Sequence, residues 1–138
     1  MIQLVTAYIG SLGFALLFGL RAKHLFPAAL GGMIGWGIYL GVYALLPGAF
    51  LPNLCASVFA VTYAELMAHL RKCPATLFVV PGVITLVPGS SLYYAMECAV
   101  NGDLAGAAAY GHQTLIVALA IAAGISFVTV CRELHTPK

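Results

Sequence analysis

The sequence predicts an all-α integral membrane protein: a single domain over residues 1–138 with five transmembrane helices, the fourth broken by two Pro-Gly pairs. Hydrophobic residues make up 62% of the chain and charged residues only 7%, whereas soluble domains carry about 25% charged residues. Mean hydropathy is +1.02, and apolar runs of roughly the 20 residues that cross a bilayer recur along the chain. A lipid bilayer is therefore the expected surrounding of the protein.

The polar residues exclude several other classes of protein. The six Lys and Arg residues stand in small groups and the formal net charge is +2, so no basic stripe is present and no nucleic-acid partner is expected. The four cysteines lie far apart, without a Cys-x-x-Cys pair or paired histidines nearby. We expect them to be small membrane hydrophobes, with no metal site, disulfide framework or cofactor.

The first two predicted spans cover residues 2–20 and 25–46. Arg21 and Lys23 follow the first apolar run as a stop-transfer flank, and no basic residue precedes it, so we expect a retained span and not a cleaved signal. The second run contains two pairs of glycines four residues apart, a spacing that lets helix backbones approach closely. Three aromatic residues at helical spacing are expected to serve packing: Trp36, Tyr39 and Tyr43.

The third and fifth predicted spans cover residues 54–70 and 104–131. Two prolines and a glycine between residues 47 and 53 end the second helix and start the third. Asp103 is a suitable N-cap for the last helix. Early in that helix lies a polar cluster that we expect to bond to neighbouring helices: His112, Gln113 and Thr114.

The fourth segment, residues 75–100, is apolar but contains Val80-Pro81-Gly82 and Val87-Pro88-Gly89. Each proline removes a backbone donor and each glycine loosens the turn, so the helix is expected to break at both pairs. In hydrocarbon, unpaired backbone groups are tolerated only where they are buried in protein or line a watery cavity. A doubly broken span that crosses the membrane therefore predicts a route for a solute.

The residues around these breaks are candidates for binding the solute. Ser90 and Ser91 fall where a second half-helix would begin, so their hydroxyls and the free amides there can receive an anionic group at the positive end of that helix. Alternatively, Ser90 only caps its own helix. Tyr93 and Tyr94 either line the same cavity or join an aromatic belt. The predicted substrate-binding residues are Pro81, Gly82, Pro88, Gly89, Ser90, Ser91, Tyr93 and Tyr94.

Three ionisable residues are candidates for proton coupling, because burying such a group in the membrane is costly unless it is paired or hydrated. Glu65 lies one turn before His69 and is either a proton-exchanging carboxylate or a shallow residue that reaches the interface. Glu97 lies near the outer end of the fourth segment, where a carboxylate among lipid headgroups is the alternative. His112 is the third candidate, and its depth depends on where the last helix starts.

The basic residues predict the orientation of the chain. All six Lys and Arg residues follow the first, third or fifth predicted span. Cytoplasmic loops are enriched in these residues, so the N-terminus is expected outside and the C-terminus in the cytoplasm. A re-entrant fourth segment would place the basic C-terminal tail outside, so we expect that segment to cross. The expected location is the inner membrane of a bacterial cell.

Two stretches of this five-span chain, PATLFVVPG at 74–82 and LVPGSSLYYAM at 86–96, resemble the threonine/serine exporter family. More closely, the chain is similar to the short membrane subunit of the two-subunit form. The resemblance implies proton-driven export of threonine and serine, or of dicarboxylates such as succinate. It also implies a larger partner that carries a cytosolic domain and five spans of its own. The residues that carry the motif are Pro81, Gly82, Pro88, Gly89 and Ser90.

Other assignments remain open on the sequence alone. Transporter sites usually lie between two structural repeats, so the chain needs a second five-span unit, either the larger partner or a second copy in a homo-oligomer. An accessory or channel-forming subunit without a substrate site is the main alternative, with the broken segment only a packing kink. A serine hydrolase using Ser90 or Ser91 with His112 is disfavoured, because no nucleophile motif surrounds either serine. We therefore expect no enzyme activity.

Overall fold

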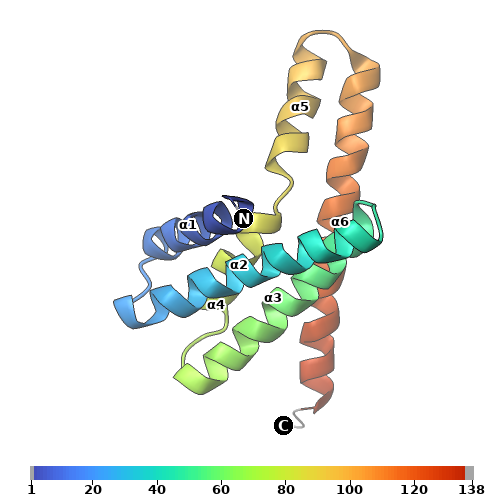
Figure 1. Ribbon diagram of the computed structural model, residues 1–138. Coiled ribbons are helices and arrows are strands. Elements are labelled where there is room, and N and C mark those ends of the chain that lie inside the picture. Colours follow the sequence, from blue (N-terminus) through green and yellow to red (C-terminus); the bar gives the residue numbers. More distant parts are fainter. Residues whose placement is uncertain (1, 136–138) are drawn as a thin grey trace.

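The computed structural model describes residues 2–135, which form helices joined by short turns, without a strand among them (Figure 1). The elements are α1 (Ile2–Leu17), α2 (Ala22–Leu45), α3 (Phe50–Arg71), α4 (Thr76–Val83), the 3₁₀ turn η1 (Ile84–Leu86), α5 (Gly89–Val100) and α6 (Leu104–His135). The all-α class predicted from the composition is confirmed.

The first helix ends at Leu17, three residues before the predicted end of the first span. Leu20 N–H donates to Ala15 O at 3.1 Å, as in a Schellman motif, and both residues belong to one buried cluster. Gly19, in the turn between them, has φ +67°, a conformation that residues with a Cβ rarely adopt. The resulting helix of 16 residues is about 24 Å long, shorter than the hydrocarbon core of about 30 Å.

Three helices are long and apolar enough to cross a bilayer by themselves: α2, α3 and α6. The pieces on either side of the bend, Thr76–Leu86 and Gly89–Val100, count as a fourth if the bent pair is one span. The structure is therefore that of a helical membrane protein with three or four candidate spans. The five predicted spans additionally require the short α1 to cross.

Small residues on α2 let it pack closely against α1, α3 and α4. A Cβ at Gly32 would overlap Ser11 Oγ of α1 and would lie 3.2 Å from Pro81 O of α4. A Cβ at Gly31 would lie 2.6 Å from Cε1 of Tyr63 in α3. The close helix approach predicted from the glycine spacing is thus present at the first of the two glycine pairs.

The fourth predicted span breaks at one of its two Pro-Gly pairs, not at both. Pro81 lies inside α4, which continues through Gly82 to Val83 and then tightens into η1. The prediction of a break there is wrong because α4 is packed against α1, α2 and α3, and burial of Pro81 and Gly82 holds the helix despite the missing N–H. The break comes at Val87, which is extended (ψ 129°), as expected for a residue before proline. Beyond Pro88, α5 leaves at an angle of 51°.

Helix α5 and the first half of α6 form a hairpin that extends beyond the other helices (Figure 1). Among the described residues, α5 packs mainly against α6, whereas α6 also packs against α3, where a Cβ at Gly124 would overlap Ser57 Oγ. At the tip of the hairpin, Asp103 Oδ1 accepts a hydrogen bond from Gly106 N–H at 3.0 Å. Asp103 is therefore the N-cap of α6, as predicted.

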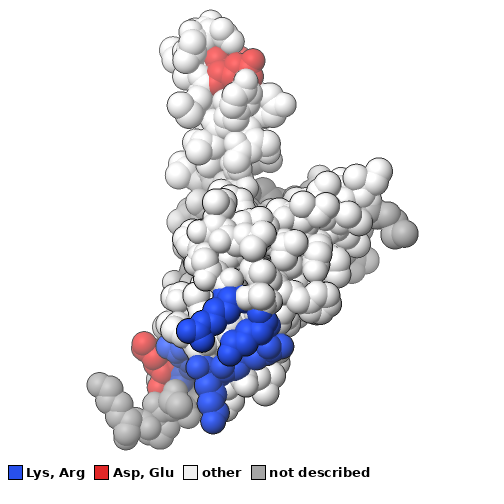
Figure 2. Space-filling view, turned by 90° about the vertical axis from the view of Figure 1, so that its left-hand side faces the viewer, with Lys and Arg blue, Asp and Glu red and all other residues white. Residues whose placement is uncertain are grey.

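The described Lys and Arg residues gather at one end of the molecule (Figure 2). They are Arg21, Lys23, Arg71, Lys72 and Arg132; Lys138, counted with them in the sequence, lies outside the described residues. Arg71 Nη1 donates to Lys23 O at 3.0 Å, which ties the end of α3 to the start of α2. Glu97 and Asp103 lie on the hairpin, far from this end. The one-sided distribution of cations in the sequence is thus one-sided in space as well.

Candidate functional site

The break at Pro88 leaves the start of α5 without a cap. The first helical hydrogen bond of α5 runs from Leu92 N–H to Pro88 O at 3.1 Å, so the amides of Ser90 and Ser91 precede it and have no acceptor within the helix. Pro88 occupies the N-cap position, and no side chain forms a capping hydrogen bond. These amides and the positive end of the helix dipole make a terminus that attracts anions.

A small cavity lies at this terminus. Its volume is about 150 Å³, roughly the volume that five water molecules occupy in the liquid. The lining residues come from α2, α3, η1, the break, α5 and α6: Trp36, Tyr39, Asn53, Thr85, Leu86, Val87, Pro88, Ser90, Ser91, Gln113 and Val117. None of these side chains carries a charge, so the cavity wall is partly polar but neutral.

Hydroxyl groups join the two helices of the hairpin beside the cavity. Ser91 is 8% exposed, and its Oγ accepts a hydrogen bond from Thr114 Oγ1 at 3.1 Å. The same Thr114 hydroxyl also donates to Tyr110 O at 2.9 Å, so its proton is shared between two acceptors. Ser91 Oγ donates to Pro88 O at 3.2 Å. The two hydroxyls fix the first turn of α5 against α6. The predicted bonding of the polar cluster to a neighbouring helix is confirmed for Thr114.

Trp36 and Tyr39 form part of the cavity wall, although their helical spacing favoured a packing role over a binding role. Their rings are stacked, with centroids 4.8 Å apart, so the packing is present. Both also line the cavity, and the indole Nε1 of Trp36 is buried without a hydrogen-bond partner among the described residues. Helical spacing could not distinguish these two roles, because both occur on the same face of α2.

Three polar side chains that the sequence did not assign to binding also line the cavity: Asn53, Thr85 and Gln113. Asn53 Nδ2 donates to Ala49 O at 2.7 Å, which leaves its Oδ1 as an acceptor. Thr85 Oγ1 donates to Gly82 O at 3.3 Å. The signal that could have found them is a polar residue inside or beside an apolar segment, since such a group needs a partner at depth.

Three of the predicted substrate-binding residues line the cavity: Pro88, Ser90 and Ser91. Gly89 lies between them in the sequence but is not a lining residue. Pro81 and Gly82 are buried within α4 and are not lining residues. Tyr93 and Tyr94 are exposed farther along α5, and the Tyr94 ring packs against that of Tyr110 with centroids 5.5 Å apart. Both tyrosines therefore lie on the surface of the chain, and neither lines the small cavity.

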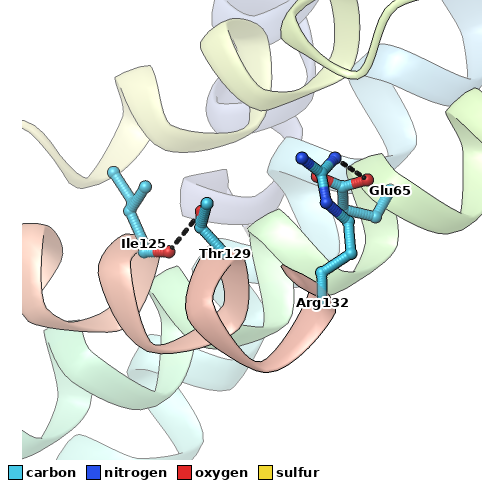
Figure 3. Close-up of polar contacts among 4 residues, drawn as sticks. All are labelled: Glu65, Ile125, Thr129 and Arg132. Carbon is cyan, nitrogen blue, oxygen red and sulfur yellow. Dashed lines mark hydrogen bonds and ion pairs between the residues drawn. The ribbon is translucent and has the colours of Figure 1, made fainter. Parts of the chain in front are cut away.

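Glu65 lies at the cation-rich end, in an ion pair with Arg132 (Figure 3). Arg132 Nη1 is 2.7 Å from Glu65 Oε1 and 2.9 Å from Oε2, and the pair links α3 to the end of α6. Thr129, one turn earlier on α6, keeps its hydroxyl bond within the helix, to Ile125 O at 2.9 Å. Glu65 and Arg132 border an open hollow of about 1250 Å³ that also includes His69. No residue of this hollow lines the small cavity.

The other two predicted proton-coupling residues lie on the hairpin. Glu97 is exposed on α5, in a shallow groove with Tyr93 and Met96. His112 is exposed on α6. The three ionisable candidates are therefore in separate places, and none of them lines the small cavity.

A second cavity, of about 320 Å³, adjoins the first. Residues of α1 form one part of it: Gln3, Thr6 and Ala7. Trp36 and Thr85 complete its lining, and these same two residues also line the smaller cavity. They are thus a shared wall between the two spaces.

Comparison with known proteins gives one family. A sequence model described as "Threonine/Serine exporter, ThrE" matches residues 3–131, nearly the whole chain. The matched range runs from α1 through the bend and the hairpin into the last turns of α6. Comparisons with curated proteins and with solved structures give no match.

Proposed function

The chain belongs to the threonine/serine exporter family, and from this premise we propose that it is the membrane subunit of a secondary transporter that exports threonine and serine. The family is one of transporters and not of enzymes. Dicarboxylates such as succinate are the second substrate class to be tested. The observation that carries the proposal is the neutral, polar cavity at the start of α5.

The carboxylate of the amino acid is the group that the start of α5 recognises. The amides of Ser90 and Ser91 have no acceptor within the helix, and the helix dipole adds a partial positive charge there. A carboxylate at this position accepts both N–H groups and meets no acidic side chain in the lining. The site therefore binds an anion without a basic residue.

The other polar groups of threonine and serine also have partners in this cavity. Asn53 Oδ1 is an acceptor for the ammonium group, and Trp36 and Tyr39 supply aromatic rings of the kind that attract a cation. The lining contains no Lys or Arg, so the second carboxylate of a dianion would be buried without a counter-charge, which is costly. The cavity favours a zwitterionic amino acid over succinate.

We place the protein in the inner membrane of a bacterial cell as a single domain of five spans, with the N-terminus outside and the C-terminus in the cytoplasm. The cluster of cations at one end supports this orientation. The short α1 crosses if the bilayer thins locally, an accommodation that costs fractions of a kcal/mol per Å of mismatch. The bent pair of helices is then the fourth span.

A second membrane subunit completes the transporter in this proposal. Ser90 and Gln113 of the cavity wall are exposed, so the chain by itself leaves the cavity open. Apolar side chains of the hairpin, such as Leu92 and Leu115, are exposed as well. We propose that a larger subunit with a cytosolic domain and five spans covers this side, as in the two-subunit exporters that the chain resembles. A second copy of the chain is the alternative partner.

Proton coupling is assigned first to Glu65. Its ion pair with Arg132 joins α3 to α6 at the cation-rich end, and uptake of a proton by the carboxylate removes the charge that holds this pair. The two helices are then free to separate at the side from which export begins. Glu97 and His112 are second-rank candidates, because each is exposed on the hairpin.

The test is efflux from proteoliposomes that contain the full chain, with and without any five-span protein that is found to co-purify with it. We expect radiolabelled threonine and serine to leave the proteoliposomes when a proton gradient is imposed, and succinate to leave more slowly. Efflux at the full rate by the partner alone would make this chain an accessory subunit without a substrate site. Absence of efflux of all three compounds with both proteins present would contradict the transporter proposal.

A further inference from the structure

One buried donor beside the candidate site has no partner. Trp36 Nε1 is fully buried and makes no hydrogen bond among the described residues. The indole nitrogen only donates, and a buried donor left unpaired is unfavourable and uncommon. Two other buried polar atoms lack partners among the described residues, Ser11 Oγ and His24 Nδ1, but neither residue lines either of the two adjoining cavities. Trp36 lines both of the adjoining cavities.

The indole is held in place by a row of aromatic rings along α2. The Trp36 ring stacks on Tyr39 with centroids 4.8 Å apart and an interplanar angle of 21°. Tyr39 in turn stacks on Tyr43 at 5.9 Å and 18°. Trp36 also packs against the buried cluster that contains Leu86 and Val117. The direction of the N–H group is therefore fixed before any ligand binds, which lowers the entropy cost of a bond to it.

The chemistry of the ligand determines which of its atoms accepts the hydrogen bond from Trp36 Nε1–H. Serine and threonine present two groups that accept hydrogen bonds, the carboxylate and the side-chain hydroxyl, whereas the ammonium group only donates. In the proposed function the carboxylate occupies the amides of Ser90 and Ser91. The hydroxyl oxygen is the acceptor that remains for a donor on a different helix.

We propose that Trp36 Nε1–H donates to the side-chain hydroxyl oxygen of bound serine or threonine, and that this bond selects these amino acids over alanine. The inference rests on the proposed function. Thr85 stands beside Trp36 in the shared wall of the two cavities, and its hydroxyl, which donates to Gly82 O, keeps acceptor capacity for the proton of the ligand hydroxyl. A site built to bond a hydroxyl rejects the analogue without it, because the buried donor is then left unpaired.

The test is a cycle of two ligands and two proteins, with the full chain purified together with its partner subunit. Binding of L-serine and L-alanine is measured by titration calorimetry for the wild type and for Trp36→Phe, which keeps an aromatic ring and removes the donor. We expect the wild type to prefer serine, and Trp36→Phe to weaken serine about tenfold while leaving alanine unchanged. Tyr43→Phe, in the same aromatic row but outside the cavity, is the control and should change neither ligand.

Other outcomes separate this inference from the proposed function. Equal weakening of serine and alanine by Trp36→Phe would make the indole a packing residue and overturn the inference. Binding of neither ligand by the wild type would count against the proposed function itself.

A second measurement needs no substitution in this chain, because Trp36 is its single tryptophan. With the chain as the only source of tryptophan signal, after replacement of tryptophans in the partner, saturating serine should shift the emission to longer wavelength and saturating alanine should not. Identical emission with both ligands bound would contradict the assignment even if the Phe variant failed to fold.

Discussion

Thr114 Oγ1 of α6 lies 3.1 Å from Ser91 Oγ of α5, and this contact holds the open start of α5 in place. Ser91 also donates to the carbonyl oxygen of Pro88, so the bond reaches from α6 to the residue at the bend. The position of the unpaired α5 amides relative to the cavity therefore depends on a residue of α6.

Replacing Thr114 with valine should loosen the start of α5. The change removes the bond to Ser91 at nearly constant side-chain volume, and we expect a loss of about 1 kcal/mol in stability together with weaker threonine binding. Thermal unfolding in detergent and calorimetric titration measure the two effects. Thr129→Val is the matched control, because that hydroxyl bonds only to Ile125 O of its own helix. An equal effect of both changes on binding would argue against a role for the Ser91 contact.

Removing one amide at the start of α5 should weaken binding directly. Ser90→Pro deletes the backbone N–H of the second residue of the helix, in the first turn, where that N–H has no acceptor within the helix. We expect threonine to bind about tenfold more weakly than to Ser90→Ala, which keeps the amide and loses the hydroxyl in the same way. Equilibrium binding of radiolabelled threonine gives the comparison. Equal affinities for the two variants would show that the carboxylate does not use this N–H.

The two prolines of the fourth segment should differ in their importance for transport. Pro88→Ala restores a backbone donor at the bend and relieves the constraint that keeps Val87 extended, so the helix can straighten. Pro81→Ala falls in a helix that is already continuous. We expect the change at Pro88 to reduce proteoliposome efflux far more than the change at Pro81. A larger loss at Pro81 would mean that α4, and not the bend, governs the route.

Neutralising Glu65 should remove the pH dependence of efflux. In Glu65→Gln the ion pair with Arg132 cannot form and no proton can be taken up at this position, so the rate should become independent of pH. Glu133→Gln, at the border of the same hollow, is the control. Efflux rates are measured across a pH series at fixed membrane potential. Retention of the wild-type pH profile in Glu65→Gln would transfer the coupling role to Glu97 or His112.

Two glycines of α2 should respond oppositely to alanine. A Cβ at Gly32 would overlap Ser11 Oγ and approach Pro81 O, so Gly32→Ala should destabilise the protein by about 1–3 kcal/mol. Gly41 has nothing within 4 Å of its added Cβ, and Gly41→Ala should be neutral or slightly stabilising, by up to about 1 kcal/mol. Thermal unfolding of the two variants side by side is the measurement. Equal stability of both would contradict the close contact between α1 and α2.

The class of the protein and the position of the bend followed from local features of the sequence. The apolar composition predicted that the protein lies in a membrane. Pro88 predicted a bend at its own position, because a proline constrains the residue before it wherever it occurs. Pro81 has the same local chemistry, yet α4 is packed against three helices and continues through Pro81 to Val83. The first helix is shorter than the apolar run predicts because Gly19 ends it in a left-handed turn.

The cavity was harder to predict because it is a product of tertiary contacts. Ser90 and Ser91 could be placed from the proline and glycine before them. Trp36, Asn53 and Gln113 lie on three different helices, and no sequence spacing relates them to one another. A single sequence therefore identifies the residues at the bend, but not the wall that faces them.

The bend at Val87 also sets how the hairpin can move. α5 extends about 18 Å beyond it, so a turn of 10° about this short hinge carries the far end of the helix through about 3 Å. The loop 101–103 ties that end to α6, which must follow or slide. A small torsional change at one residue is thereby converted into a displacement of several ångströms at the end of the molecule away from the cations.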